Sequence, residues 1–242
     1  MKPLFRLHLL TLALSLAALL AASGPTPALA ADASPEPPGA VAARLQQRYD
    51  AMHSLSFAFT QSTEGEMAGR PRRGSGRAVF LKGDGKRQMR WDYDSPEKQV
   101  LVSDGEIFSM YFENLQQMIV SPARTIEEDM TYSFFTGSGR LAENFAILGP
   151  NKNIVDGEED PGLRVIQLMP RSTESQVQDI HLWVTADSLI RRIEIRDQFD
   201  TRTILTLSDI RENPLADESG EALSALFSFS PPQGTEIIHQ DE

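Results

Sequence analysis

The apolar residues of this chain repeat first with the period of a helix and then with the period of a strand. Val41, Leu45, Tyr49 and Met52 recur every three to four positions, with polar residues between them. This spacing predicts an amphipathic helix of about three turns that buries one side. From Ser56 onward apolar and polar residues alternate, which is typical of strands that bury one face.

The alternating segments are short, and turn residues separate them at intervals of about 8–12 positions, as in all-β domains. The Asp104-Gly105 pair, for example, indicates a tight hairpin between two of them. The predicted strands cover residues 56–61, 77–81, 89–93, 100–102, 107–112, 118–120, 163–168, 180–184, 190–196, 203–210 and, as a last strand, 227–229. An antiparallel meander of this length normally closes or is covered, because open strand edges attract other chains.

Residues 121–150 do not follow the strand pattern, although they include Phe134, Phe135 and Phe145. We predict one or two short helices in this stretch and a further helical turn over residues 222–226. No internal repeat is detectable. The sequence therefore predicts a single, mainly β domain with a few short helices attached to it.

The N-terminal segment has the three parts of a secretory signal peptide. A basic start precedes an apolar run over residues 7–22, and a small-x-small pattern ends at Ala30. The run is shorter than the ~20 strongly apolar residues of a comfortable transmembrane helix. We therefore expect cleavage after Ala30, with an uncleaved membrane anchor as the alternative. Residues 31–39, rich in proline and alanine, predict a flexible linker ahead of a folded domain over 40–242.

Composition excludes several classes of function. The chain has no cysteine, so its core forms without disulfides, and thiol catalysis, thiolate metal sites and a lipid-modified N-terminal cysteine are excluded. It has 34 acidic and 23 basic residues and a formal net charge of −11. A surface of this sign argues against nucleic acid as a partner.

Catalytic patterns are scarce in the sequence. Asp179 and His181 are two residues apart on a predicted strand, but two ligands are too few for a closed metal site. We therefore expect His181 to be an ordinary surface histidine. No nucleophile stands in a motif with a base, and no phosphate-binding or dinucleotide pattern is present. A hydrolase of lipid or glycan, the enzyme alternative, has no support, so we expect a protein that is not an enzyme and that uses no cofactor and no metal.

Four segments, in this order, resemble the LolA family: residues 45–61, residues 89–93 with the following Ser95-Pro96, residues 101–105 and residues 227–234. Members of that family are periplasmic carriers that take lipoproteins from the inner to the outer membrane of Gram-negative bacteria. The resemblance implies an unclosed antiparallel β-barrel, or half-barrel, with a lid of short helices. The acyl chains of the lipoprotein would occupy the space between the sheet and the lid.

Together with the alternation, the resemblance implies which residues surround the acyl chains. The lipid-binding cavity is expected to be lined by Met89, Trp91, Tyr93, Phe108, Met110, Ile193 and Ile195. The lid or its rim is expected to include Leu45, Tyr49, Phe134, Phe135 and Phe145. The implied partners are acylated lipoproteins, an inner-membrane lipoprotein-releasing ABC transporter and, where one exists, an outer-membrane acceptor lipoprotein, with the carrier a monomer in the periplasm. A periplasmic lipid-binding or envelope-stress sensing module of the same fold is the alternative.

One segment departs from the family. Carriers of the best-known type have Lys-Arg-Pro after the strand that precedes the tryptophan strand, and that arginine is held to latch the lid by bonding to its backbone. This chain reads Lys-Gly-Asp-Gly-Lys-Arg over residues 82–87, with no arginine in register. We expect a lid that is more open or is held by different contacts, with Lys86 and Arg87 as the nearby candidates to replace the arginine.

Overall fold

The computed structural model describes residues 36–65, 69–83, 85–127, 134–135, 139–151, 162–173 and 175–240. The predicted signal peptide, its cleavage after Ala30 and most of the predicted linker lie outside these residues. One compact unit spans Glu36–Glu242. Among the described residues, no helix combines the length and the apolar character needed to cross a membrane.

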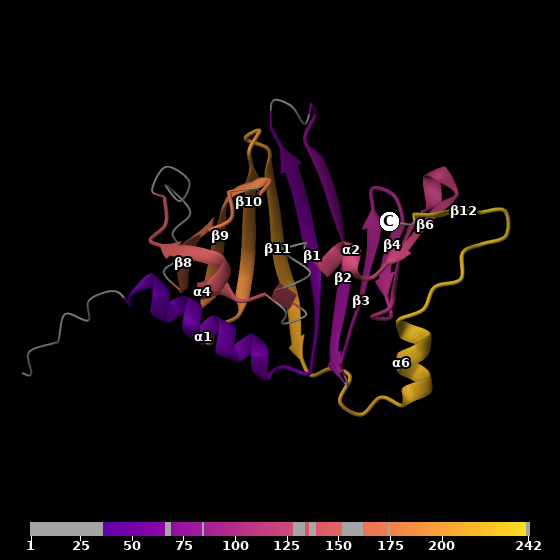
Figure 1. The fold of residues 1–242 in the computed structure, drawn as a ribbon, viewed down its shortest axis with the longest axis horizontal. Helices are drawn as coiled ribbons and strands as arrows, with labels where there is room; N and C mark the ends of the chain where they lie inside the picture. Colours follow the sequence, from indigo (N-terminus) through magenta and orange to yellow (C-terminus); the bar gives the residue numbers. More distant parts are fainter. Residues whose placement is uncertain are drawn as a thin grey trace, which may run out of the picture. The chain divides into compact units, whose positions relative to one another are not determined.

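The strands of the described chain form one curved sheet (Figure 1). They are β1 (Ser54–Glu64), β2 (Arg72–Gly83), β3 (Lys86–Ser95), β4 (Gln99–Ser103), β5 (Ile107–Phe112), β6 (Gln117–Pro122), β7 (Phe145–Leu148), β8 (Leu163–Pro170), β9 (Val177–Thr185), β10 (Ile190–Asp197), β11 (Arg202–Glu212) and β12 (Glu236–His239). Their order across the sheet is β12-β6-β5-β4-β3-β2-β1-β11-β10-β9-β8-β7. The edge strands β12 and β7 do not pair with each other, so the predicted mainly β, unclosed half-barrel is confirmed.

The prediction for the end of the chain is wrong. Residues 227–229 form no strand; Phe227 instead ends helix α6 (Gly220–Leu226), and its side chain is buried. The Arg90 guanidinium donates to the carbonyl oxygens of Leu226 and Ser228, which therefore bond to a side chain and not to a neighbouring strand. The last strand is β12, and it pairs in parallel with β6. This pairing breaks the purely antiparallel meander that the sequence predicted.

The middle of the chain holds the predicted short helices and also an unpredicted strand. The helices are α2 (Arg124–Glu127) and α4 (Leu141–Asn144), and a 3₁₀ turn, η1 (Glu113–Leu115), precedes β6. Phe145 to Leu148, for which helix was predicted, instead form β7, which pairs with β8. Four residues show too little alternation to reveal a strand, so pairing with a neighbour decided this segment.

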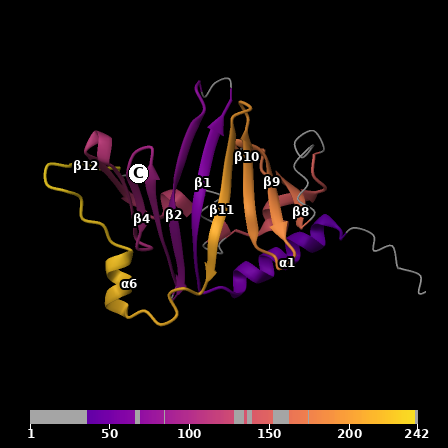
Figure 2. The ribbon, with the colours of Figure 1, turned by 180° about the vertical axis from the view of Figure 1, so that it is seen from behind.

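Helix α1 (Pro38–Ala51) lies across the ends of β8, β9 and β10 (Figures 1 and 2). It begins with Pro38, inside the predicted linker, because proline suits the first turn, where no N–H donor is needed. Val41, Leu45 and Tyr49 are buried, as the helical spacing predicted. The backbone N–H of Ile190 donates to the Tyr49 hydroxyl at 3.1 Å, which joins the helix to the start of β10.

A glycine in β2 permits two aromatic rings to meet across three strands. Gly76 is in register with Phe59 of β1 and with Tyr93 of β3. The two rings lie edge to face, with their centroids 4.9 Å apart. A Cβ atom at Gly76 would lie 1.9 Å from the carbonyl oxygen of Asp92, so no other residue fits without moving the backbone. Strand β2 therefore requires glycine at position 76.

Candidate functional site

Two adjoining cavities lie on one face of the sheet, which we call the inner face. Their volumes are about 500 Å³ and about 520 Å³. Ile193 and Ile195 of β10 line both cavities, so the two meet at this strand. Each volume falls within the ~300–1,000 Å³ that is typical of sites for small organic ligands.

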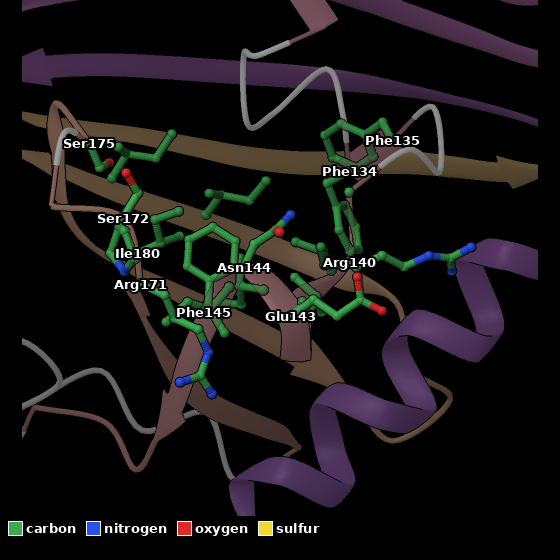
Figure 3. A pocket seen from close by; sticks show the side chains of 18 residues that line it. Phe134, Phe135, Arg140, Glu143, Asn144, Phe145, Arg171, Ser172, Ser175 and Ile180 are labelled. Carbon is green, nitrogen blue, oxygen red and sulfur yellow. The ribbon is translucent and has the colours of Figure 1, made fainter.

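The first cavity, which we call the α4 cavity, lies between α4 and strands β8 to β10 (Figure 3). Its apolar lining consists of Phe134, Phe135, Leu141, Phe145, Leu168, Pro170, Ile180, Leu182, Ile190, Ile193 and Ile195. Its polar lining consists of Arg140, Glu143, Asn144, Arg171, Ser172 and Ser175. In Figure 3, Phe134 and Phe135 lie toward one end of the cavity, and Phe145 and Ile180 lie toward the other.

The second cavity, which we call the Trp91 cavity, is lined from strands β1 to β6, β10 and β11 and from helix α2. Its apolar and aromatic lining consists of Phe80, Met89, Trp91, Tyr93, Leu101, Phe108, Met110, Ile126, Ile193, Ile195 and Leu205. Its polar lining consists of Gln61, Ser121, Thr125, Thr203 and Gln240. Methionine adapts to irregular apolar shapes, so Met89 and Met110 give this wall some freedom to change shape.

The structure places all the predicted cavity residues on the inner face. Met89, Trp91, Tyr93, Phe108 and Met110 line the Trp91 cavity, and Ile193 and Ile195 line both cavities. The period-two pattern was sufficient to choose these residues, because alternate side chains of a strand point to the same face. Their contact with a ligand remains a prediction.

The predicted lid or rim residues divide into two groups. Phe134, Phe135 and Phe145 line the α4 cavity, although Phe145 does so from β7 and not from a lid helix. Leu45 and Tyr49 line neither cavity; they are only 0% and 1% exposed, where α1 packs on the sheet. The ring of Tyr49 lies 4.8 Å from that of Phe134 between centroids. Tyr49 thus packs against the cavity wall at Phe134, and Leu45 is buried beneath α1.

Several residues that line the two cavities were not predicted from the sequence. They are Gln61, Phe80, Leu101, Ile126, Leu141, Leu168, Ile180, Leu182, Ile190 and Leu205. Strand register identifies some of these, since Leu182 on β9 and Leu205 on β11 lie opposite Ile193. Leu141 is different, because its place depends on where α4 packs, and no sequence pattern indicated that.

Helix α4 is joined to helix α1 by two polar contacts. The backbone N–H of Leu141 donates to Gln46 Oε1 at 3.0 Å, which satisfies an N–H at the start of the short helix. The Arg140 guanidinium donates to Asp50 Oδ2 at 2.7 Å. These contacts connect the wall of the α4 cavity to the first helix, so they are candidates for a latch.

Lys82 joins helix α1 to the sheet. It begins the segment over residues 82–87, in which this sequence differs from the family that it resembles. The Lys82 ammonium donates to the backbone carbonyl of Tyr49 in the last turn of α1. Burial lowers the pKa of Lys82 below its usual value. Lys86 does not take this role, because its ammonium pairs with Glu106 at 2.6 Å and both side chains are exposed. For Arg87 the prediction stays untested.

His181 is not the surface histidine that the sequence predicted. Its side chain is completely buried on the opposite face of β9 from the cavity residues Ile180 and Leu182. Its Nε2 accepts a hydrogen bond from the backbone N–H of Asn151, and its Nδ1 lies 3.2 Å from Asp179 Oδ1. Burial lowers the pKa of His181, against the nearby charge of Asp179. The position is therefore structural.

The described residues of the two cavity linings include few groups that exchange protons. The described residues that line them include one carboxylate, Glu143, and no histidine. General acid–base catalysis needs positioned groups that exchange a proton with the substrate, commonly in a pair. No cluster of three or more His, Asp or Glu side chains that could hold a metal ion is found in the described part of the chain. The described linings of both cavities are mainly apolar surface, with a few polar groups at the margin.

Known proteins similar to this chain were found by sequence and by structure. The sequence model of the family described as "Outer membrane lipoprotein carrier protein LolA" matches residues 50–220. An outer-membrane lipoprotein carrier protein of Methylococcus capsulatus is 29% identical over 195 residues, which is 81% of this chain and 86% of that protein. One from Nitrosomonas europaea is 28% identical over 167 residues, which is 69% of this chain and 73% of that protein. A solved structure of a LolA superfamily protein from Nitrosomonas europaea has a TM-score of 0.38 at 11% identity and covers 80% of this chain and 98% of its own.

Proposed function

This chain belongs to the LolA family, and on that premise we propose that it is a carrier that shields the acyl chains of lipoproteins in its two inner-face cavities. The observation that carries the proposal is the pair of largely apolar cavities that meet at Ile193 and Ile195. Each methylene group removed from water contributes about 0.8 kcal/mol, so a long acyl chain strongly favours such a site over solution. The relatives are named lipoprotein carrier proteins, which agrees with an acylated ligand.

The proposal extends to the route of the cargo. The signal peptide, cut after Ala30, would deliver the protein to the periplasm, where it moves lipoproteins from the inner to the outer membrane as a monomer. An inner-membrane lipoprotein-releasing ABC transporter would load it, and an outer-membrane acceptor lipoprotein would unload it. Such a carrier carries out no chemical step. An intact mass that begins at Ala31 in periplasmic material is the expected result for export and cleavage.

Native mass spectrometry of the protein purified from its own periplasm tests the function. We expect a bound acylated protein. Free lipid alone would contradict the carrier and favour the alternative, a lipid-binding or envelope-stress sensing module, and an empty protein would contradict both. Ile193→Ser should lose the bound species, because it places a hydroxyl where the two cavities meet. Ile204→Ser is the matched control, since Ile204 is the neighbour of Leu205 on the opposite face of β11.

A further inference from the structure

The Trp91 cavity contains a hydrogen-bond donor that the described chain leaves without an acceptor. Trp91 is 8% exposed, and its indole Nε1 is buried with no hydrogen-bond partner among the described residues. A buried donor without a partner costs about 1–3 kcal/mol, so such a group calls for an explanation. Two other buried polar atoms, His181 Nδ1 and Asp179 Oδ1, differ because they face each other at 3.2 Å on the opposite side of the sheet.

A second donor lies in the same lining. The Tyr93 hydroxyl donates to Gln61 Oε1 at 2.8 Å, which uses the acceptor of that amide. The Gln61 amide nitrogen, with its two N–H groups, has no bonded acceptor among the described residues. The hydroxyls of Ser121 and Thr125 are bonded to each other at 3.0 Å. The lining therefore offers two donors, Trp91 Nε1 and the Gln61 amide, that bond to no acceptor among the described residues.

A lining of this kind matches a ligand group that only accepts hydrogen bonds. An ester carbonyl is such a group, whereas a hydroxyl or an amide brings a donor that would itself need an acceptor. Given the acyl-binding function proposed above, we propose that Trp91 Nε1 and the Gln61 amide form a binding site for the carbonyl oxygen of an ester-linked acyl chain. The methylene tail of that chain lies along the apolar lining of the Trp91 cavity.

The site forms when the ligand enters. Indole Nε1 is covered in the structure, so a carbonyl oxygen reaches it only after a neighbouring side chain moves. The aromatic neighbours are poorly suited to move, because Phe57 and Phe80 hold the indole edge to face at centroid distances of 5.6 Å and 5.9 Å. Met89 and the partly buried Met110 line the same cavity, and their unbranched side chains change rotamer readily.

Two probes separate the carbonyl from the tail: a lipopeptide with two ester-linked hexadecanoyl chains and its analogue with two ether-linked hexadecyl chains. The chain contains only two tryptophans, so the indole N–H signals of the unaltered protein are easily assigned by NMR. We expect the ester probe to move the Trp91 indole proton downfield, the ether probe to leave it nearly in place, and the Trp183 signal to respond to neither. Equal responses of Trp91 to both probes would overturn the proposal.

Variants provide the second test. Trp91→Phe and Gln61→Leu should each weaken binding of the ester lipopeptide by about 2- to 10-fold, the usual contribution of one hydrogen bond, and leave the ether lipopeptide unchanged. Trp183→Phe, on the outer face, is the matched control and should alter neither affinity. Equal losses for the two probes, or no loss for either, would contradict the carbonyl site and leave the carrier function intact. Failure of the unaltered protein to bind either probe would instead contradict the proposed function itself.

Discussion

The ammonium group of Lys82 donates to the backbone carbonyl oxygen of Tyr49, in the last turn of helix α1. The backbone N–H of the same lysine donates to the carbonyl of His53 at 2.7 Å, just beyond the helix. The Tyr49 carbonyl also accepts from the backbone N–H of Met52, so the ammonium adds a second bond there, and a cation at this place interacts favourably with the negative end of the helix dipole. The end of β2 thus holds α1 through a lysine contact.

Removal of this ammonium should destabilise the protein. Lys82→Met keeps most of the apolar stem and loses the charge-assisted hydrogen bond, so we expect a loss of about 1–2 kcal/mol in the free energy of unfolding. Urea denaturation followed by circular dichroism measures it. Lys86→Met is the matched control, because the exposed pair of Lys86 and Glu106 should contribute less than about 0.5 kcal/mol. Equal effects of the two changes would show that the Tyr49 contact has no special importance.

The contact between Asp50 and Arg140 should control how often helix α4 separates from helix α1 in local opening motions. Both side chains are partly exposed, so Asp50→Asn should change global stability by less than about 1 kcal/mol. It should nevertheless speed hydrogen exchange of the Leu141 amide, which is bonded to Gln46 on the same helix. The exchanged pair Asp50→Arg with Arg140→Asp should restore slow exchange. Unchanged exchange in Asp50→Asn would rule out this contact as a latch.

Gly76→Ala should be among the most damaging single substitutions in the chain. The added methyl group would lie 1.9 Å from the Asp92 carbonyl oxygen, within the β2–β3 pairing. We expect a loss of about 3 kcal/mol or more in the free energy of unfolding. Gly83→Ala in the same strand is the control, since nothing lies within 4 Å of a Cβ there. A mild effect at Gly76 would mean that β2 and β3 separate easily.

Burial of His181 should make stability depend on pH below about 7. Its pKa is lowered in the folded state, so the unfolded chain, whose histidines have a pKa near 6.5, binds the proton first. Stability should therefore fall as the pH drops below about 6.5 and level off below the lowered pKa. His181→Gln should flatten this dependence in urea midpoints measured at pH 7.5 and 5.5. The exposed His53 offers the control His53→Gln, which should keep the slope.

Local sequence determined much of the fold and of the candidate site. The change from a helical to a two-residue period marked α1 and most of the strands, because side-chain direction along a single segment depends only on backbone geometry. The same geometry chose Met89, Trp91, Phe108 and Ile193 as residues of one face. The resemblance supplied the half-barrel and its lid. These properties are local or inherited, so the sequence was sufficient to predict them.

Only the tertiary structure decided which distant segments meet. The parallel pairing of β12 with β6, the burial of His181 and the contact of Lys82 with Tyr49 each join residues far apart in the chain. Such contacts depend on which helices and loops pack on the ends and the outer face of the sheet. The periodicity of apolar residues does not predict that packing. The same limit applies to the Trp91 indole, which has no acceptor among the described residues, because such a donor is recognised only from the atoms packed around it. The sequence thus determined which faces are apolar, and packing determined what each face and each polar group meets.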